Sequence, residues 1–303
     1  MRIWDGLISG LSPEEILAVL STNDSLFQRR QYGIVNMLDE PVSFSGTMDG
    51  QAYYSIARVC DDLRYAIQGN VLTGVQVITN SENAFLATEG DLGQKVMAAM
   101  EAARVYGGDG RCSCSEVFPT SCGCPPAAFD YSAFTAFWIL ARMGDVDDDA
   151  CPDLGCAGGQ YFGNLNVISG FGGPEPVLLL EDQYVAWRAA RAGLADQIRS
   201  TVTPSAERLD AHPSSHLTVE VELRDLEGAP VLDPSTTLSV DRAYDGPEVA
   251  KIGHISSPSP GRFRFAVHAT RNPGIGRWRL TAHQGTQDVL LWPELVIPVD
   301  PLP

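Results

Sequence analysis

The pattern of apolar residues changes once along the 303-residue chain, and this change limits the folds that the chain can adopt. Up to about residue 200, helical periodicity alternates with short strand-like runs, as in a mixed α+β domain. The segment 201–215 is rich in Pro, Ser and charged residues, which is the composition of a linker. Short alternating runs separated by Gly- and Pro-bearing turns follow it. We therefore expect a first domain over 1–200, a linker over 201–215 and a β-sandwich domain over 216–303.

Local signals place the elements of the first domain. Ser12 and Glu15 form a capping-box pattern around Pro13, which predicts a helix over 13–22. In the helix expected over 91–106, five apolar residues recur at helical spacing: Leu92, Val96, Met97, Met100 and Ala103. We further expect strands at 30–38, 41–46, 63–70 and 161–169, an apolar strand buried on both faces at 131–142, and helices at 74–88 and 176–200.

The second domain reads as a small immunoglobulin-like sandwich, because its short strands recur at regular spacing between turn residues. The clearest strands lie at 217–225, 236–242, 261–269, 276–284 and 289–299.

Charge and hydropathy exclude two classes of partner. The formal net charge of -17 argues against nucleic acid, which is bound by clustered Lys and Arg. The sequence lacks an uninterrupted apolar run of the length that crosses a bilayer, so we expect no membrane span. A small-molecule or peptide substrate remains open.

Six of the seven cysteines fall in two neighbouring loops: Cys112, Cys114, Cys122, Cys124, Cys151 and Cys156. The Cys-x-Cys pairs are poor matches to zinc or redox dithiol spacings, whereas Gly- and Pro-rich loops are where disulfides stabilise most. We favour disulfides, with zinc or free thiols as alternatives, and interpret Cys60 as a buried free thiol. Disulfides imply an extracellular or periplasmic protein. Since the first residues do not form a secretory signal, we expect that an N-terminal piece is missing.

The distribution of histidines restricts the chemistry of the first domain. All five histidines, His212, His216, His254, His268 and His283, lie after residue 211. A Ser-His-Asp or Cys-His centre inside the first domain is therefore excluded, and a catalytic zinc held by histidine is disfavoured there. We interpret the five histidines as surface residues.

The loop "GDVDDDACPDLG" carries alternate carboxylates at Asp145, Asp147 and Asp149, as calcium loops do. It is no EF-hand, because Ala150 and Cys156 stand where that loop needs Gly and Glu. The sequence leaves calcium binding open at this loop, and a solvated acidic loop is the alternative.

Several segments together resemble a known family. They are, in order, "GLSPEEIL", "RRQYGIVN", "YAIQGNVLTG" and "AARVYGGDGR", followed by "FTAFWILAR" and "YFGNLNV". This order resembles the domain of unknown function 1028 family, which is related to N-terminal-nucleophile (Ntn) hydrolases. The segments "GGDGRCSCS" and "PTSCGCPP" resemble the cysteine-bearing form of that family found in exported bacterial proteins. The resemblance covers roughly residues 6–190.

The resemblance implies a layered αββα sandwich that lacks the family's opening strands, so we expect instability or homodimer formation through the exposed edge. In Ntn hydrolases the first residue of the mature chain is Thr, Ser or Cys, and its own α-amine acts as the base. Residue 1 is Met here and no nucleophile is identified. The family's Cys-x-x-Trp-Ala-Gly stretch is also replaced, by "MDGQAYYSIA".

By position in the family, six residues are expected to line the cleft: Arg30, Gln31, Gln68, Asn70, Asp109 and Arg111. Gln68 and Asn70 would orient an amide or carboxylate, and Asp109 with Arg111 would form a polar clamp. The alternative is that these residues satisfy turns and a buried ion pair.

Two functions follow. The first is an exported Ntn-hydrolase-like protein, an amide hydrolase when complete and inactive as this chain. The second is a non-catalytic extracellular module whose immunoglobulin-like domain recognises carbohydrate or protein.

Overall fold

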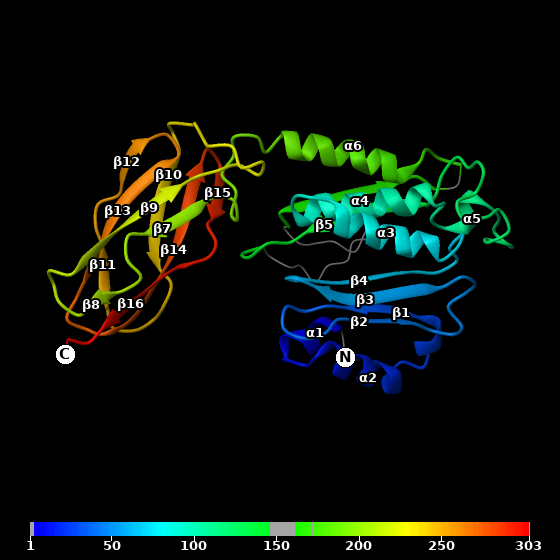
Figure 1. The fold of residues 1–303 in the computed structure, drawn as a ribbon, viewed down its shortest axis with the longest axis horizontal. Helices are drawn as coiled ribbons and strands as arrows, with labels where there is room; N and C mark the ends of the chain where they lie inside the picture. The colour runs from blue at the N-terminus through cyan, green and yellow to red at the C-terminus, as the bar shows by residue number, and fades with distance from the viewer. Residues whose placement is uncertain (1–2, 146–160, 171, 303) are drawn as a thin grey trace. The chain divides into compact units, whose positions relative to one another are not determined.

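The computed structural model describes residues 3–145, 161–170 and 172–302. The chain forms two compact units, Met1–Ala141 with Asp147–Tyr184 (unit 1) and Arg142–Val146 with Val185–Pro303 (unit 2). Unit 1 mixes helices and strands, and unit 2 is built almost entirely of strands (Figure 1). The α+β class is therefore confirmed.

The elements of unit 1 are α1 (Ile3–Ile8), α2 (Pro13–Asn23), the 3-10 turn η1 (Phe27–Arg29), β1 (Gln31–Ile34), β2 (Val42–Ser45), β3 (Tyr54–Cys60), β4 (Leu63–Gly69), α3 (Gln76–Ala87), α4 (Leu92–Val105), α5 (Gly110–Ser113), β5 (Thr135–Leu140), β6 (Gly163–Ile168) and most of α6 (Pro176–Ala189).

Successive layers build the first half of unit 1 (Figure 1). Helix α2 contacts β2 of the β1–β2 hairpin, this hairpin contacts the β3–β4 hairpin, and α3 contacts β3 and β4. The pattern of side chains explains the order. One face of β3–β4 carries Tyr54, Ile56 and Ile67, which pack with Val77 and Ile78 of α3. The other face is small and polar, and there Ser43 Oγ donates a hydrogen bond to Gln68 Oε1 at 2.9 Å.

Capping boxes fix the starts of α2 and α4. At α2 the Glu15 amide donates to Ser12 Oγ while the Ser12 amide donates to Glu15 Oε2, so two end groups of the helix are satisfied. Asp91 and Gln94 repeat the arrangement at α4. The expected helix starts are therefore confirmed at α2 and α4.

The β5–β6 hairpin packs one face inward, against α4 and α6. The ring of Trp138, 2% exposed, lies 5.2 Å from that of Tyr184 in α6. Gly93 permits the close approach of α4, since a Cβ there would lie 2.8 Å from the Trp138 ring. Phe137 is 64% exposed on the opposite face. The expectation that this strand is buried on both faces is wrong, because inward and outward residues alternate along it.

Unit 2 contains the strands β7 (Thr201–Pro204), β8 (Leu209–Asp210), β9 (His216–Glu222), β10 (Thr237–Arg242), β11 (Ala250–Ile252), β12 (Ser256–Ser259), β13 (Arg262–Ala269), β14 (Gly274–Gln284), β15 (Gln287–Leu290) and β16 (Leu295–Asp300).

These strands form two five-stranded sheets, one ordered β10-β14-β16-β8 with β15 on β14, the other β11-β13-β9-β7 with β12 on β13. One core between them takes residues from both sheets, among them Val219, Phe265, Leu280 and Ile297. The predicted β-sandwich is confirmed in this form.

Two boundary predictions in unit 2 are wrong. Residues 201–215 are no linker, because β7 pairs with β9 and β8 pairs in parallel with β16. The single strand expected over 289–299 is two strands, β15 and β16, since Trp292 and Pro293 interrupt the pairing.

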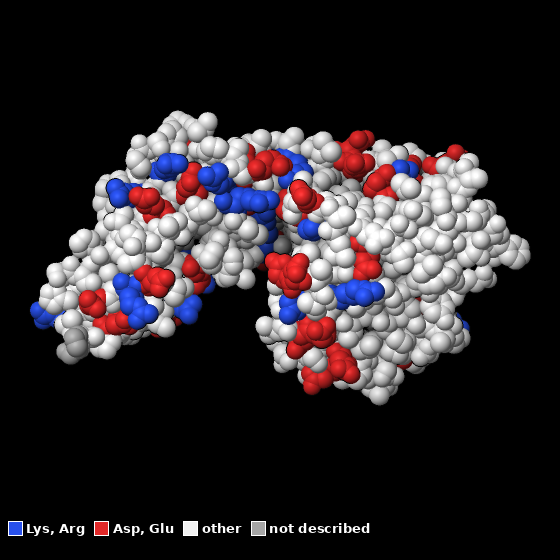
Figure 2. Space-filling view, in the orientation of Figure 1, with Lys and Arg blue, Asp and Glu red and all other residues white. Residues whose placement is uncertain are grey.

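Charges of both signs interleave over much of the face shown in Figure 2, whereas the end of unit 1 that holds α5 carries few. The loop after α5 adds two exposed apolar side chains, Val117 and Phe118. No helix among the described residues has the length and apolar character needed to cross a bilayer.

Strand β16 offers a direct test of the sandwich core. Ile297 is fully buried while its neighbour Val296 is 39% exposed. Ile297→Ala should lower the free energy of unfolding of unit 2 by about 2–5 kcal/mol, because it removes buried methyl groups and leaves a cavity. Val296→Ala should change it by less than about 1 kcal/mol. Denaturant unfolding followed by the fluorescence of buried Trp278 measures both, and equal losses would contradict the assigned core.

Candidate functional site

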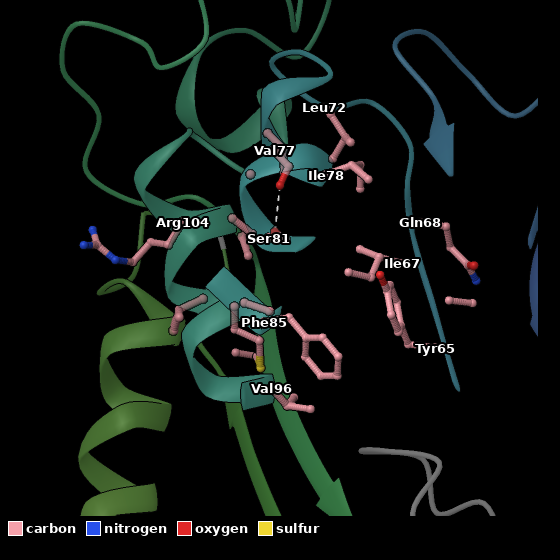
Figure 3. Close-up of a pocket in the computed structure, with 18 of the residues that line it drawn as sticks. Tyr65, Ile67, Gln68, Leu72, Val77, Ile78, Ser81, Phe85, Val96 and Arg104 are labelled. Carbon is pink, nitrogen blue, oxygen red and sulfur yellow. Dashed lines mark hydrogen bonds between the residues drawn. The ribbon is translucent and has the colours of Figure 1, made fainter. Parts of the chain in front are cut away.

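A cavity of about 530 Å³ lies in unit 1 between β4 and the helices α3 and α4 (Figure 3). Most of its lining is aliphatic or aromatic. From α4 it takes the residues Leu92, Val96, Ala99, Met100, Ala103 and Arg104. Four of these belong to the stripe that the sequence predicts by its helical spacing. Met97, the fifth of that stripe, is buried but does not line the cavity.

The cavity lies against β4. Five consecutive residues of this strand, 64–68, contribute to its lining. Successive side chains of a strand point to opposite faces, so the lining includes residues of both faces of β4. Figure 3 shows this geometry, with Tyr65 and Ile67 directed toward α3 and α4 and Gln68 directed away from them.

One edge of β4 is unpaired in the part of the chain that the structure describes. Among the described strands, β4 pairs with β3 alone, and β5, which lines the cavity through Thr135 and Ala136, pairs with β6 alone. An open edge presents a row of unpaired N–H and C=O groups that can pair with another extended segment.

Polar groups at the cavity are few and mostly engaged. Ser81 Oγ donates to the carbonyl of Val77 within α3. Ser132 donates through its amide and hydroxyl to Glu175, a carboxylate 8% exposed that also accepts from the amide of Val177 at the start of α6. The cavity therefore offers an apolar surface and a backbone edge rather than a cluster of unpartnered charges.

Tyr65 is the most perturbed titratable group of the lining. Its hydroxyl donates to Glu82 Oε1 at 2.7 Å, and Glu82 also pairs with Arg58. Burial, reinforced by the hydrogen bond and negative charge of Glu82, raises the pKa of Tyr65 from 10.0 to about 12. Tyr65 therefore stays neutral and acts as an apolar wall with a fixed orientation.

The structure brings two of the six expected cleft residues, Gln68 and Asp109, to the cavity. The Gln68 amide nitrogen has no hydrogen-bond partner among the described residues and remains available as a donor. Asp109 caps α5 and forms a two-pronged ion pair with Arg111. Arg111 itself does not line the cavity.

The other three expected residues serve local structure. Arg30 pairs with Asp24, Gln31 Nε2 donates to Ser45 Oγ at 2.7 Å, and Asn70 Nδ2 donates to the carbonyl of Asp49. None of the three lines the cavity. The alternative of satisfied turns and ion pairs fits these positions.

The cysteine-rich loop contains one disulfide, Cys114–Cys122. Cys112 and Cys124, expected to form disulfides, carry free thiols among the described residues, as does Cys60. Cys124 Sγ lies 3.4 Å from Thr73 Oγ1 and packs with residues of α3, and Cys112 lies on α5. Cys151 and Cys156 lie outside the described residues.

Of the three aspartates in the calcium prediction, the structure describes Asp145. Asp145 Oδ2 accepts a hydrogen bond from the amide of Arg142, whereas Asp147 and Asp149 lie outside the described residues. Within the described ranges, no group of three or more His, Cys, Asp or Glu is arranged to hold a metal ion.

A sequence model described as "Family of unknown function (DUF1028)" matches residues 1–118. The match supports the expected family over this part of the chain. No curated protein matches the chain in sequence.

Similar solved structures include two bacterial adhesins. InvE of Yersinia pseudotuberculosis is 17% identical, with a TM-score of 0.28, over 35% of this chain and 27% of that chain. FdeC of Escherichia coli is 15% identical, with a TM-score of 0.28, over 35% of this chain and 31% of that chain. The matched part thus spans about a third or less of either adhesin chain.

The raised pKa of Tyr65 makes the stability of unit 1 sensitive to alkaline pH. Folding favours the neutral phenol, so this contribution is complete below pH 10.0 and is lost as pH rises toward 12. Tyr65→Phe should flatten this part of the pH dependence, while Tyr53→Phe, at an exposed position, should not. Denaturant midpoints between pH 8 and 11.5 measure the effect, and an unchanged alkaline slope in Tyr65→Phe would contradict it.

Thiol reactivity tests the cysteine assignment. Burial, and secondarily the charge of Asp109, raises the pKa of Cys112 from 9.0 to about 12, which lowers its thiolate fraction at pH 8 by about 10³-fold. Iodoacetamide should therefore modify native Cys112 far more slowly than the unfolded chain, and Cys114 and Cys122 only after reduction. Peptide mass mapping gives the answer. Rapid native labelling of Cys112, or labelling of Cys114 without reductant, would overturn the assignment.

Proposed function

We propose that unit 1 binds an extended peptide segment along the open edge of β4. The observation that supports this is the lining of the cavity by five consecutive strand residues, 64–68. A peptide added beside β4 would pair its N–H and C=O groups with those of the strand.

The two sides of the edge differ in chemistry, which gives such a peptide a preferred orientation. On the side of α3 and α4, Tyr65, Ile67, Phe85 and Val96 offer apolar contacts. On the other side Gln68 offers an amide donor. An alternating sequence suits this geometry, with apolar side chains toward the helices and polar ones away from them.

The size and charge of the cavity fit a short, uncharged segment. A volume of about 530 Å³ falls within the range of ligand sites and holds the side chains of a few residues. Arg64 and Arg104 on the lining stand against Asp109, so no single sign of charge dominates.

We further propose that unit 1 is a layered αββα scaffold of the Ntn-hydrolase type in an exported protein. The order α2, β1–β2, β3–β4, α3–α4 and the family match support the scaffold, and the Cys114–Cys122 disulfide supports export. An Ntn amide hydrolase would act on the same class of ligand, a peptide amide. No residue of the cavity is assigned as a nucleophile, so we propose binding rather than cleavage for this chain.

A binding experiment tests the site. The probe is a fluorescein-labelled peptide of alternating Val and Thr flanked by Lys, and its control carries N-methyl groups at every second residue on one edge. Polarisation should show binding of the first peptide and at least about tenfold weaker binding of the second, because N-methylation removes edge donors. Equal affinity for both peptides would exclude strand addition.

A matched pair of variants on α4 locates the binding. Ala99→Met places a larger side chain in the cavity and should weaken peptide binding at least about tenfold, whereas Ala98→Met, one residue away and outside the lining, should not. Two outcomes would redirect the proposal: mass-spectrometric detection of peptide cleavage would favour the hydrolase, and a concentration-dependent dimer that excludes the peptide would favour a second copy at this edge.

Unit 2 provides the second candidate function, recognition of a carbohydrate. A pocket of about 270 Å³ on its β7-β9-β13 sheet has hydroxyl and charged groups in its lining, among them Thr201, Thr203, Glu220 and Arg264, beside the apolar residues Val221, Pro258 and Phe263. Such groups suit a polyhydroxylated ligand better than an apolar one. Binding of soluble oligosaccharides that is lost in Thr203→Val would support it.

A further inference from the structure

Three side chains on the outer face of unit 2 have the connectivity of a catalytic triad. Ser239 lies on β10, His283 on β14 and Asp288 on β15. His283 Nδ1 is 2.6 Å from Asp288 Oδ1, and His283 Nε2 is 2.9 Å from Ser239 Oγ. We infer that Ser239, His283 and Asp288 form an acyl-transfer site for small activated esters, with Ser239 as the nucleophile.

The register of the sheet creates this arrangement. His283 stands directly opposite Asp288, while Ser239 stands opposite Thr281 and therefore lies diagonal to His283. Such neighbours on one face of a sheet lie within side-chain reach. The alternate residues of the same strands, Leu238 and Ala282, point into the core and hold the backbone in place.

The hydrogen bonds select one tautomer of His283. An ionised Asp288 only accepts, so the proton between these two groups resides on Nδ1. Neutral Nε2 is then an acceptor, and the hydroxyl of Ser239 donates to it. This is the ground state that a serine nucleophile requires, with the base in contact with the hydroxyl and an acid orienting the base.

Two neighbours of Ser239 affect its reactivity. Asp241 Oδ2 lies 3.2 Å from Ser239 Oγ and competes with His283 for the hydroxyl proton. Thr281, on the same face, has no hydrogen-bond partner for its hydroxyl among the described residues, so it can donate to an oxyanion that forms next to Ser239.

The exposure of the site determines its substrate class. The side chain of His283 is 38% exposed and that of Asp288 is 72% exposed, on an open sheet face. Water around the site weakens the electrostatic stabilisation of the transition state, which is stronger in buried triads. Esters with a good leaving group need the least oxyanion stabilisation and no protonation of the leaving group, so they are the expected substrates rather than amides.

The reaction proceeds in two balanced steps. Ser239 Oγ forms a bond to the acyl carbon, its proton passes to His283 Nε2, and the alcohol or phenol leaves with the electrons of the broken C–O bond and takes up that proton. Water then attacks the acyl-serine and gives a proton to His283 Nε2. Ser239 leaves with the bonding electrons and regains the proton, which releases the carboxylic acid.

The chain contains its own control. Ser214 Oγ lies 2.6 Å from His212 Nδ1 in a turn, but no carboxylate is bonded to that imidazole among the described residues. A serine activated by the full triad should therefore react faster than Ser214, although both contact a histidine.

The experiment uses the full chain, p-nitrophenyl acetate and a fluorophosphonate probe. Peptide mass mapping should place the phosphonate on Ser239, about 10²-fold faster than on Ser214. Ester turnover should vanish in Ser239→Ala, fall about 10²-fold in His283→Gln and fall several-fold in Asp288→Asn, and Ser214→Ala should leave it unchanged.

Circular dichroism and the unfolding midpoint establish that each variant is folded, and Ser239→Cys supplies a second nucleophile that should restore acetylation at this position. Labelling of Ser239 and Ser214 at equal rates would overturn the inference. So would labelling of His283→Gln at the rate of the unchanged chain, because the hydroxyl would then react without its base.

Discussion

Each described sheet of unit 1 has two strands. The stability that so little backbone pairing does not supply has to come from packing between these sheets and the helices. An isolated two-stranded hairpin is marginal in water, so β1–β2, β3–β4 and β5–β6 are stable only through the layers on either side of them. Apolar residues of β3 and β4 pack on α3, and Trp138 packs on α4 and α6. Because β4 pairs with β3 alone among the described strands, its other edge is unpaired there, and the cavity lies against this strand.

Unit 2 pairs more strands in each sheet. Its two five-stranded sheets share one core of buried apolar residues between them. Strand register there sets which polar side chains meet, as it does for Ser239, His283 and Asp288. In unit 1 the candidate site lies against the backbone of a strand, and in unit 2 it consists of side chains that the strand register places next to one another.

Local signals predicted much of the fold. The capping box of Ser12 and Glu15 predicted the start of α2, and the apolar stripe predicted α4. Both signals are local, because helix ends and helix faces depend on nearby residues. Strand β3 was missed, since its sequence of small and mixed residues shows no clear alternation of apolar and polar side chains. Its place is set by contacts distant in sequence, with the β1–β2 hairpin on one face and α3 on the other.

The candidate sites were less predictable, because they depend on contacts distant in sequence. Gln68 and Asp109 line the cavity, whereas Arg30 and Asn70 do not, since an ion pair and a turn engage them locally. The open edge of β4 has no sequence signature. The sequence around His283 did not indicate a site either. Ser239 lies on another strand, and it is the pairing register of β10 and β14 that places the two side chains together.

The segment 201–215 moves the boundary of the domain that evolution could transfer as a unit. Its strands β7 and β8 belong to different sheets of unit 2. Contacts begin even earlier, because the amide of Ala195 donates to Gln284 Oε1 and Gln284 Nε2 donates to the carbonyl of Gly193. A gene fusion that joined this sandwich to another protein at residue 216 would lose an edge strand from each sheet. To keep these contacts and the ion pair of Arg188 with Glu227, the junction has to lie before Arg188.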